Sequence, residues 1–169
     1  MVGSKILVVF YSRSGTTRKI AQALAKAMRC DLEEISEPKS RAGFFGYTRS
    51  LLEALLRRPA VIAAKKRDVA AYDLVIVGTP VWGSSLSSPA RAYLMATAPQ
   101  LPDVAFFCCF GGSGSESTFA QMTAVTGKKP RACCAITQGE VQAGTFGGPL
   151  ATFEKALSVM TADVQPVRV

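Results

Sequence analysis

A short polar segment, Ser12–Thr17 (SRSGTT), directly follows the first apolar segment of the chain, Ile6–Tyr11. Such an apolar segment is typical of a strand covered on both faces, and a helical pattern begins immediately after the polar residues. Free backbone N–H groups at the start of a helix, together with the positive end of its dipole, bind phosphate groups. Neighbouring hydroxyls add hydrogen bonds of about 1.5–3 kcal/mol each when the acceptor is charged. We therefore predict that the turn Ser12–Thr17 holds a phosphate.

Two further polar loops each follow an apolar segment. The loop Thr79–Ser85 (TPVWGSS) contains the only tryptophan of the chain, and the loop Gly111–Ser115 (GGSGS) is rich in glycine. In an open parallel sheet, ligands bind outside the carboxyl ends of the strands, so all three loops are expected to meet at one edge. An indole offers a stacking face, and glycine lets a ligand approach the backbone closely. The predicted ligand is therefore a flat aromatic ring system that carries one phosphate.

Strand and helix patterns alternate along the chain, which predicts an α/β domain with a parallel sheet. Three apolar segments (Ile6–Tyr11, Leu74–Gly78 and Val104–Phe110) are expected to be central strands, and two more polar ones (Asp31–Ile35 and Arg131–Thr137) to be edge strands. Helices are predicted from apolar spacing and from caps. One helix has Ile20, Leu24, Ala27 and Met28 on one face, and another begins at the N-cap Ser88 and ends at about Ala96. A further helix has Phe119, Met122 and Val125 on one face and ends at Gly127, and the last is marked by Leu150, Phe153, Leu157 and Met160.

One basic insertion, at about residues 38–73, interrupts this regular spacing between the second and third strands. It is longer than a single crossover helix requires, and a helix ending at Arg58, before Pro59, is predicted within it. Phe44–Phe45, which lie between two glycines, either cover the core or form a flap beside a ligand. Contact of the basic residues 41–67 with a membrane surface is the less favoured alternative for this insertion.

The composition limits the classes of function. The chain has 169 residues, 49% of them hydrophobic, with no histidine, five cysteines and a net charge of +8. This predicts a single compact domain. No apolar run is long enough to span a membrane and no secretory signal is recognisable, so a cytoplasmic location with reduced, buried thiols is expected. Because histidine, the commonest general base, is missing, any chemistry is expected to come from a cofactor.

Three segments together resemble the FMN-binding segments of the flavodoxin family. They are YSRSGTTRKIAQAL after the first apolar strand, GTPVWGSSLSSPARAYL in the middle of the chain and FGGSGSESTFAQM after the fourth strand. The resemblance covers nearly the whole chain. It implies a three-layer flavodoxin-like fold, in which a five-stranded parallel sheet of order 2-1-3-4-5 carries helices on both faces and FMN is bound noncovalently.

The resemblance also assigns parts of the cofactor to residues. It implies that Ser12, Ser14, Gly15, Thr16 and Thr17 hold the phosphate with Arg13 beside them, that Pro80, Val81, Trp82 and Gly83 line one face of the isoalloxazine, and that Gly111, Gly112, Ser113 and Gly114 offer backbone N–H groups to its pyrimidine edge. In similar flavodoxins the peptide at the Gly83 position flips to bond the reduced flavin, a movement that glycine permits.

Two departures from the flavodoxin pattern bear on function. Electron-carrier flavodoxins commonly have a second aromatic residue in the third loop, whereas residues 113–118 contain none, which leaves one flavin face open or covered by Phe44, Phe45 or Tyr47. Those carriers are also typically acidic, and this basic chain is expected to hold its flavin at a higher potential. Two redox functions therefore remain: a carrier that docks a redox partner protein, and a reductase that accepts hydride from NAD(P)H and reduces a quinone-like acceptor. A non-catalytic interaction module is the alternative.

Other classes of function lack their sequence signals. A dinucleotide-binding dehydrogenase needs GxGxxG after the first strand, and SRSGTT does not match it, so Glu33 and Glu34 near the expected ribose-binding position carry no weight. A phosphatase with a similar loop needs a cysteine nucleophile, which the turn lacks. Nucleic-acid binding is suggested only by charge and has no motif. The three loops contain no acid, and Glu116, directly after the third loop, is expected to complement the dipole at the start of a helix.

Overall fold

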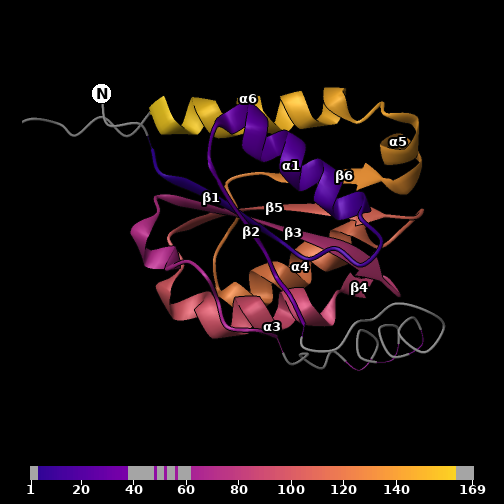
Figure 1. The fold of residues 1–169 in the computed structure, drawn as a ribbon, viewed down its shortest axis with the longest axis horizontal. Helices are drawn as coiled ribbons and strands as arrows, with labels where there is room; N and C mark the ends of the chain where they lie inside the picture. Colours follow the sequence, from indigo (N-terminus) through magenta and orange to yellow (C-terminus); the bar gives the residue numbers. More distant parts are fainter. Residues whose placement is uncertain (1–3, 38–47, 49–51, 53–55, 57–61, 163–169) are drawn as a thin grey trace, which may run out of the picture.

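A computed structural model describes residues 4–37, 48, 52, 56 and 62–162 of the chain. Its sheet has the order β2-β1-β3-β5-β6, with all neighbours on this path parallel. The strands are β1 (Ile6–Phe10), β2 (Asp31–Glu34), β3 (Leu74–Trp82), β5 (Asp103–Phe110) and β6 (Cys133–Thr137) (Figure 1). The order equals the predicted 2-1-3-4-5 once the additional strand β4 (Ser85–Leu86), which pairs only with β3, is set aside.

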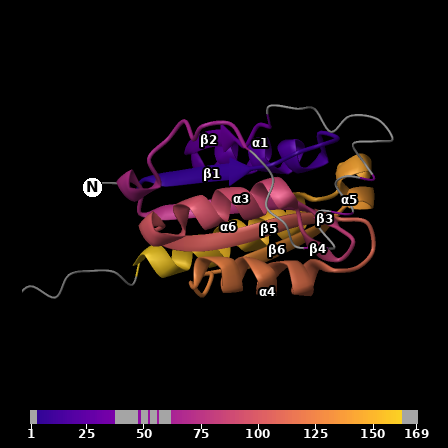
Figure 2. The same cartoon turned by 90° about the horizontal axis from the view of Figure 1, so that it is seen from below.

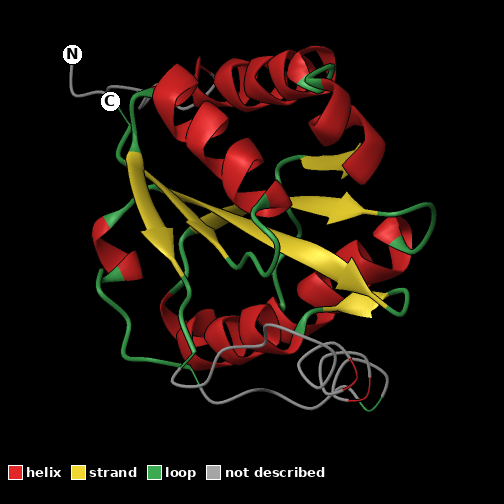
Figure 3. Cartoon of the chain, turned by 45° about the vertical axis from the view of Figure 1, so that its right-hand side comes forward, coloured by secondary structure: helices red, strands yellow, loops and turns green. Residues whose placement is uncertain are grey.

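Helices cover both faces of the sheet and form the outer two of three layers (Figure 3). The helices are α1 (Thr16–Met28), α5 (Gln138–Ala143) and α6 (Gly147–Ala162) on one face, and α3 (Ser88–Thr97) and α4 (Ser115–Thr126) on the other, with short 3₁₀ helices at Val69–Ala71 and Ala98–Gln100. Seen from below, α3 and α4 lie in front of the sheet (Figure 2). The predicted three-layer α/β fold is therefore confirmed.

The central strands are buried on both faces, as their apolar sequences predict. Leu7 to Phe10 are at most 1% exposed, whereas the edge strand β6 alternates between exposed and buried residues. One core cluster packs α1 and α6 against the sheet, and a second packs α3 and α4 against the opposite face. A Cβ added to Gly78 would lie 1.9 Å from the ring of Phe107. This position in β3 therefore cannot carry a side chain unless Phe107 moves.

The region after Gly78 differs from the prediction of a loop. β3 continues to Trp82, turns at Gly83 and Ser84, and returns as β4. Both turn residues have positive φ, 55° and 56°, which is the requirement of the type I′ turn that suits the twist of a two-residue hairpin. Trp82 therefore belongs to a hydrogen-bonded hairpin rather than to an irregular loop.

Three helix details also differ from expectation. α3 is capped by Ser87 and not by Ser88, and the Ser87 hydroxyl bonds Thr79 rather than the helix. Ala27 is exposed, because the buried face of α1 is formed by Thr17, Ile20, Ala21, Leu24 and Ala25. α5 was not expected; it begins with a capping box in which Thr137 and Glu140 bond each other's backbone N–H groups.

Most of the basic insertion and its aromatics Phe44, Phe45 and Tyr47 lie outside the described residues. Where residues are described, the N–H of Leu56 donates to the carbonyl of Leu52 at 2.9 Å, and both side chains are exposed. Within the described ranges, no helix combines the length and the apolar character that crossing a membrane requires.

All five cysteines are described and none forms a disulfide. Cys108, Cys109 and Cys134 are buried as predicted and Cys30 is half-buried, but Cys133 is exposed on the edge strand. Burial raises the pKa of the Cys30 and Cys134 thiols to about 11 and also raises that of Cys108.

Candidate functional site

The turn between β1 and α1, which we call the first turn (Ser12–Thr17), is organised by one serine hydroxyl. Ser12 Oγ accepts hydrogen bonds from the N–H groups of Gly15, at 3.1 Å, and of Arg18, at 3.2 Å. Gly15 is the N-cap of α1 and has a left-handed φ of 93°, a conformation that side-chain-bearing residues rarely adopt. Because Ser12 uses its lone pairs as the acceptor, its own hydroxyl proton remains available for an anion.

The same turn retains donors that the described residues leave without a partner. The N–H groups of Thr16 and Thr17 lie in the first helical turn, where no preceding carbonyl can accept them. Thr17 is fully buried and its hydroxyl forms no hydrogen bond with any described residue. Since an unmade hydrogen bond at a buried polar group costs about 1–3 kcal/mol, an acceptor bound at this turn would be stabilised. Arg13 and Ser14 are exposed at its rim.

An ion pair borders the first turn. Arg18 donates from Nε to Glu34 Oε2 at 3.1 Å and from Nη2 to Glu34 Oε1 at 2.5 Å, a pairing that raises the pKa of Arg18. Glu33 points to the other face of the sheet, is 5% exposed and accepts the N–H of Lys66 at 2.9 Å. Glu33 and Glu34, which lie near the position expected of a ribose-binding acid, therefore both accept hydrogen bonds from other residues of the chain.

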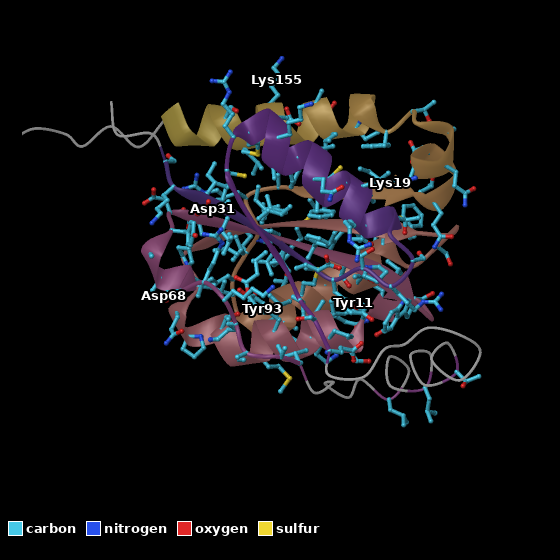
Figure 4. The ribbon with its side chains drawn as sticks, viewed as in Figure 1. Tyr11, Lys19, Asp31, Asp68, Tyr93 and Lys155 are labelled. Atoms are coloured by element: carbon cyan, nitrogen blue, oxygen red, sulfur yellow. The ribbon has the colours of Figure 1, made fainter. Side chains whose placement is uncertain are left out.

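The hairpin (Trp82–Ser85) presents the tryptophan beside the end of β1. The rings of Trp82 and Tyr11 meet edge to face, with centroids 5.6 Å apart and planes at 90°. The Tyr11 hydroxyl donates to Glu37 at 2.9 Å, and Tyr11 lies at the end of β1 away from Asp31 (Figure 4). Trp82 is half-buried, as is Val81, while Pro80 is buried in β3. Contact with Tyr11 thus restricts the orientation of the indole.

A buried glutamine, Gln121 of α4, holds the hairpin to the helices beneath it. Its Oε1 accepts from Ser85 Oγ at 2.7 Å, from the N–H of Leu86 at 3.3 Å and from Arg91 at 2.5 Å. We did not predict this residue. Its signal was available, because position 121 shares a helical face with Met122 and Val125, where a polar residue is expected to have a specific partner.

The third loop (Gly111–Gly114) touches the hairpin, and Cys109 of β5, two positions before the loop, contacts the first turn. At Gly114, φ is 94° and an added Cβ would lie 2.5 Å from the Cα of Ser84 in the hairpin turn. At the base of the loop, burial raises the pKa of the Cys109 thiol, and a hydrogen bond with the Thr16 hydroxyl of the first turn opposes that rise. The three predicted loops therefore meet at one edge of the sheet.

Two glycines of the third loop are open. Gly111 and Gly112 are exposed, and a Cβ added to either would meet nothing within 4 Å. Packing among the described residues therefore does not require glycine at positions 111 and 112. A ligand that approaches the backbone closely at these positions would require it. Ser113 is also exposed beside them.

These features suit a flat ring with a single phosphate. The first turn offers N–H groups, a buried hydroxyl without a partner and a neighbouring guanidinium to an anion. The hairpin offers an indole, and Gly111 and Gly112 leave the backbone of the third loop open to a ligand. The residues present thus fit the group predicted from the sequence.

Comparison with known proteins agrees with this arrangement. The family model for flavodoxin matches residues 5–135, which include the first turn, the hairpin and the third loop. An NAD(P)H dehydrogenase (quinone) of Chromohalobacter salexigens is 29% identical to this chain, and the match covers 84% of this chain and 80% of that protein.

Solved structures show the same fold at low identity. A flavoprotein of Lactobacillus acidophilus in complex with FMN superposes with a TM-score of 0.70 at 22% identity, covering 83% of this chain and 98% of that one. A candidate flavoprotein of Bacteroides eggerthii gives a TM-score of 0.71 at 21% identity, covering 90% and 99%. At such identities the likeness establishes the fold alone.

Proposed function

The chain belongs to the flavodoxin family, and from that premise we propose that it binds FMN at the carboxyl edge of its sheet and transfers electrons through it. The observation that carries the proposal is the buried Thr17 hydroxyl without a partner, in a turn whose glycine is already left-handed. The FMN complex of the similarly folded Lactobacillus acidophilus protein supports the choice of ligand.

In this proposal each segment holds one part of FMN. The phosphate is held by Ser12, Ser14, Gly15, Thr16 and Thr17, with Arg13 beside it; Pro80, Val81, Trp82 and Gly83 line one face of the ring; and Gly111, Gly112, Ser113 and Gly114 bind its pyrimidine edge. FMN supplies the capacity to take up and release one or two electrons. The protein contributes position and electrostatics. Glu116, the acid nearest the loops in sequence, is exposed in the first turn of α4, where it complements the dipole.

For the overall reaction, we favour an NAD(P)H-dependent reductase of a quinone-like acceptor. The name of the Chromohalobacter salexigens relative supports this choice. The exposed third loop without an aromatic side chain also supports it, because an open flavin face leaves room for a nicotinamide and then an acceptor. A single-electron carrier that docks a partner protein is the second candidate, favoured by the small size of the chain.

Purification without added flavin tests the central proposal. We expect a yellow protein that releases FMN, and not FAD or riboflavin, when it is denatured. A colourless protein that does not take up FMN at micromolar concentration would overturn the proposal and favour a non-catalytic interaction module.

Stopped-flow reduction of the FMN-loaded protein separates the two redox candidates. A reductase is reduced rapidly by NADH or NADPH without any partner protein and then reoxidised by a soluble quinone. A carrier is reduced only when a flavin-dependent or iron–sulfur reductase is added. Slow reduction by both nicotinamides would therefore reject the reductase.

A further inference from the structure

Arg18 lies beside the first turn with part of its guanidinium unused. Nε and Nη2 donate to the two oxygens of Glu34, and no described residue accepts a hydrogen bond from Nη1. Nη1 is 3.7 Å from the position that a Cβ of Gly15 would occupy, which places it against the backbone of the N-cap. A guanidinium has five N–H donors, so it can bond a carboxylate along one edge and an anion along another.

Glu34 determines where the guanidinium lies. It is the last residue of β2, in register with Phe10 at the end of β1, so its backbone is fixed by the sheet at the carboxyl edge. The two-bond contact restrains both the position and the plane of the Arg18 guanidinium. Without this pair, the Arg18 side chain would be a flexible cation near the start of α1.

We propose that Arg18 is a charged ligand of the flavin phosphate and that Glu34 is its positioning residue. The inference rests on the proposed binding of FMN at the first turn. The N–H groups and hydroxyls of that turn are neutral donors, whereas a phosphomonoester carries close to two negative charges at neutral pH. Nη1 supplies a charge-assisted hydrogen bond from the side of Gly15, and the Glu34 pair keeps the guanidinium there before the ligand arrives.

The test compares FMN with riboflavin, which lacks the phosphate. Arg18→Met keeps much of the aliphatic stem and removes the guanidinium; we expect FMN affinity to fall about 10- to 100-fold while riboflavin affinity stays within about twofold. Glu34→Gln keeps a similar shape but loses the two-bond pair, and we expect a smaller loss, about three- to tenfold, again confined to FMN. Inorganic phosphate should raise the thermal midpoint of the FMN-free wild-type protein more than that of Arg18→Met.

Arg67→Met is the matched control. Arg67 pairs at 3.1 Å with Asp31, the first residue of β2, whereas Arg18 pairs with Glu34, the last residue of the same strand. The side chains of Arg67 and Arg18 are 41% and 42% exposed. Arg67→Met lowers the net charge by the same amount as Arg18→Met, but at the end of β2 away from the first turn. It should therefore leave the ratio of FMN to riboflavin affinity unchanged.

The possible outcomes separate this inference from the function. Wild-type protein that binds FMN while Arg18→Met binds it equally well would overturn the role of Arg18 and leave the proposed function intact. A Glu34→Gln variant that binds FMN more tightly would overturn the positioning role of Glu34. Wild-type protein that binds no FMN would overturn both the function and this inference. Equal losses in the Arg18 and Arg67 variants would reduce the effect to net charge and overturn the inference as well.

Discussion

Gly114 and Ser84 touch backbone to backbone: a Cβ on Gly114 would lie 2.5 Å from the Cα of Ser84. We expect Gly114→Ala to push the third loop away from the hairpin and to destabilise the protein by about 2 kcal/mol, because alanine is strained at the φ of 94° and the N-cap of α4 meets the hairpin turn directly. FMN and riboflavin should lose affinity equally, because the displaced loop serves the ring. Urea unfolding and flavin titration measure the two effects.

Gly112→Ala provides the contrast, since a Cβ there meets nothing within 4 Å. The free energy of unfolding should change by less than about 0.5 kcal/mol, while flavin binding weakens if the ring approaches this backbone. Unchanged flavin affinity in this variant would contradict a role for the open glycines.

The second prediction uses Trp82, the only tryptophan of the chain. If it lines the ring, titration with FMN should quench most of the tryptophan fluorescence, because a flavin absorbs where an indole emits. Riboflavin should reach the same final quenching at higher concentration. Tyr11→Phe, which keeps the ring that meets Trp82 at 5.6 Å, should quench equally. Binding that is visible by flavin absorbance without a change in tryptophan emission would place the ring elsewhere.

The third prediction concerns Gly78 in the centre of β3. A Cβ there would lie 1.9 Å from Phe107 Cζ, so Gly78→Ala should cost about 3 kcal/mol of unfolding free energy through overpacking. Phe107→Leu removes the far atoms of the ring and should recover part of that loss in the double variant, so the two effects will not add. Additive losses, measured by urea unfolding of all four proteins, would show that the contact is not the cause.

The fourth prediction is a loss of stability at alkaline pH. Burial raises the pKa of Cys30 and Cys134 from 9.0 to about 11. The unfolded chain therefore releases these protons first, so stability is retained below about pH 9 and falls as the pH rises towards 11. Under reducing conditions, the urea midpoint should be lower at about pH 10.5 than at about pH 8. The decrease should be smaller in Cys134→Ser, and an equal decrease there would exclude this thiol as a cause.

The fifth prediction is a higher flavin potential than in acidic carriers. The chain has a net charge of +8, and Arg13 and Lys19 are exposed at or next to the first turn. Positive charge within about 10 Å stabilises a reduced, anionic flavin at 0.1 M salt. Reductive titration should give a higher potential that decreases when the salt concentration is raised. A potential as low as that of an acidic carrier, or one insensitive to salt, would contradict this view.

The central strands and the meeting of the three loops could be predicted from the sequence because they depend on burial patterns, whereas the strand order was implied only by the resemblance to the flavodoxin family. Ile6–Tyr11, Leu74–Gly78 and Val104–Phe110 are apolar throughout, which only central strands of a covered sheet require. The carboxyl ends of parallel strands share one edge, so the loops that follow them also share it.

The details that were missed depend on tertiary contacts. The β3–β4 hairpin relies on positive φ at both Gly83 and Ser84, and serine is not a residue that indicates such a conformation. The Arg18–Glu34 pair joins α1 to β2 across 16 positions, and no periodicity reports such a contact. The position of Gln121 on the apolar face of its helix indicates a buried partner, but the hairpin residues that it bonds can be identified only in the structure.

The Ser12 hydroxyl, which caps the N–H groups of Gly15 and Arg18, has a consequence for ligand exchange. The first turn is already closed by the chain's own hydrogen bonds, so the proposed binding of a phosphate there would require little rearrangement of the backbone, and its release would leave the turn intact. Preorganisation of this kind lowers the conformational cost of association. We therefore expect the proposed FMN site to fill after folding is complete, as a separate and reversible event.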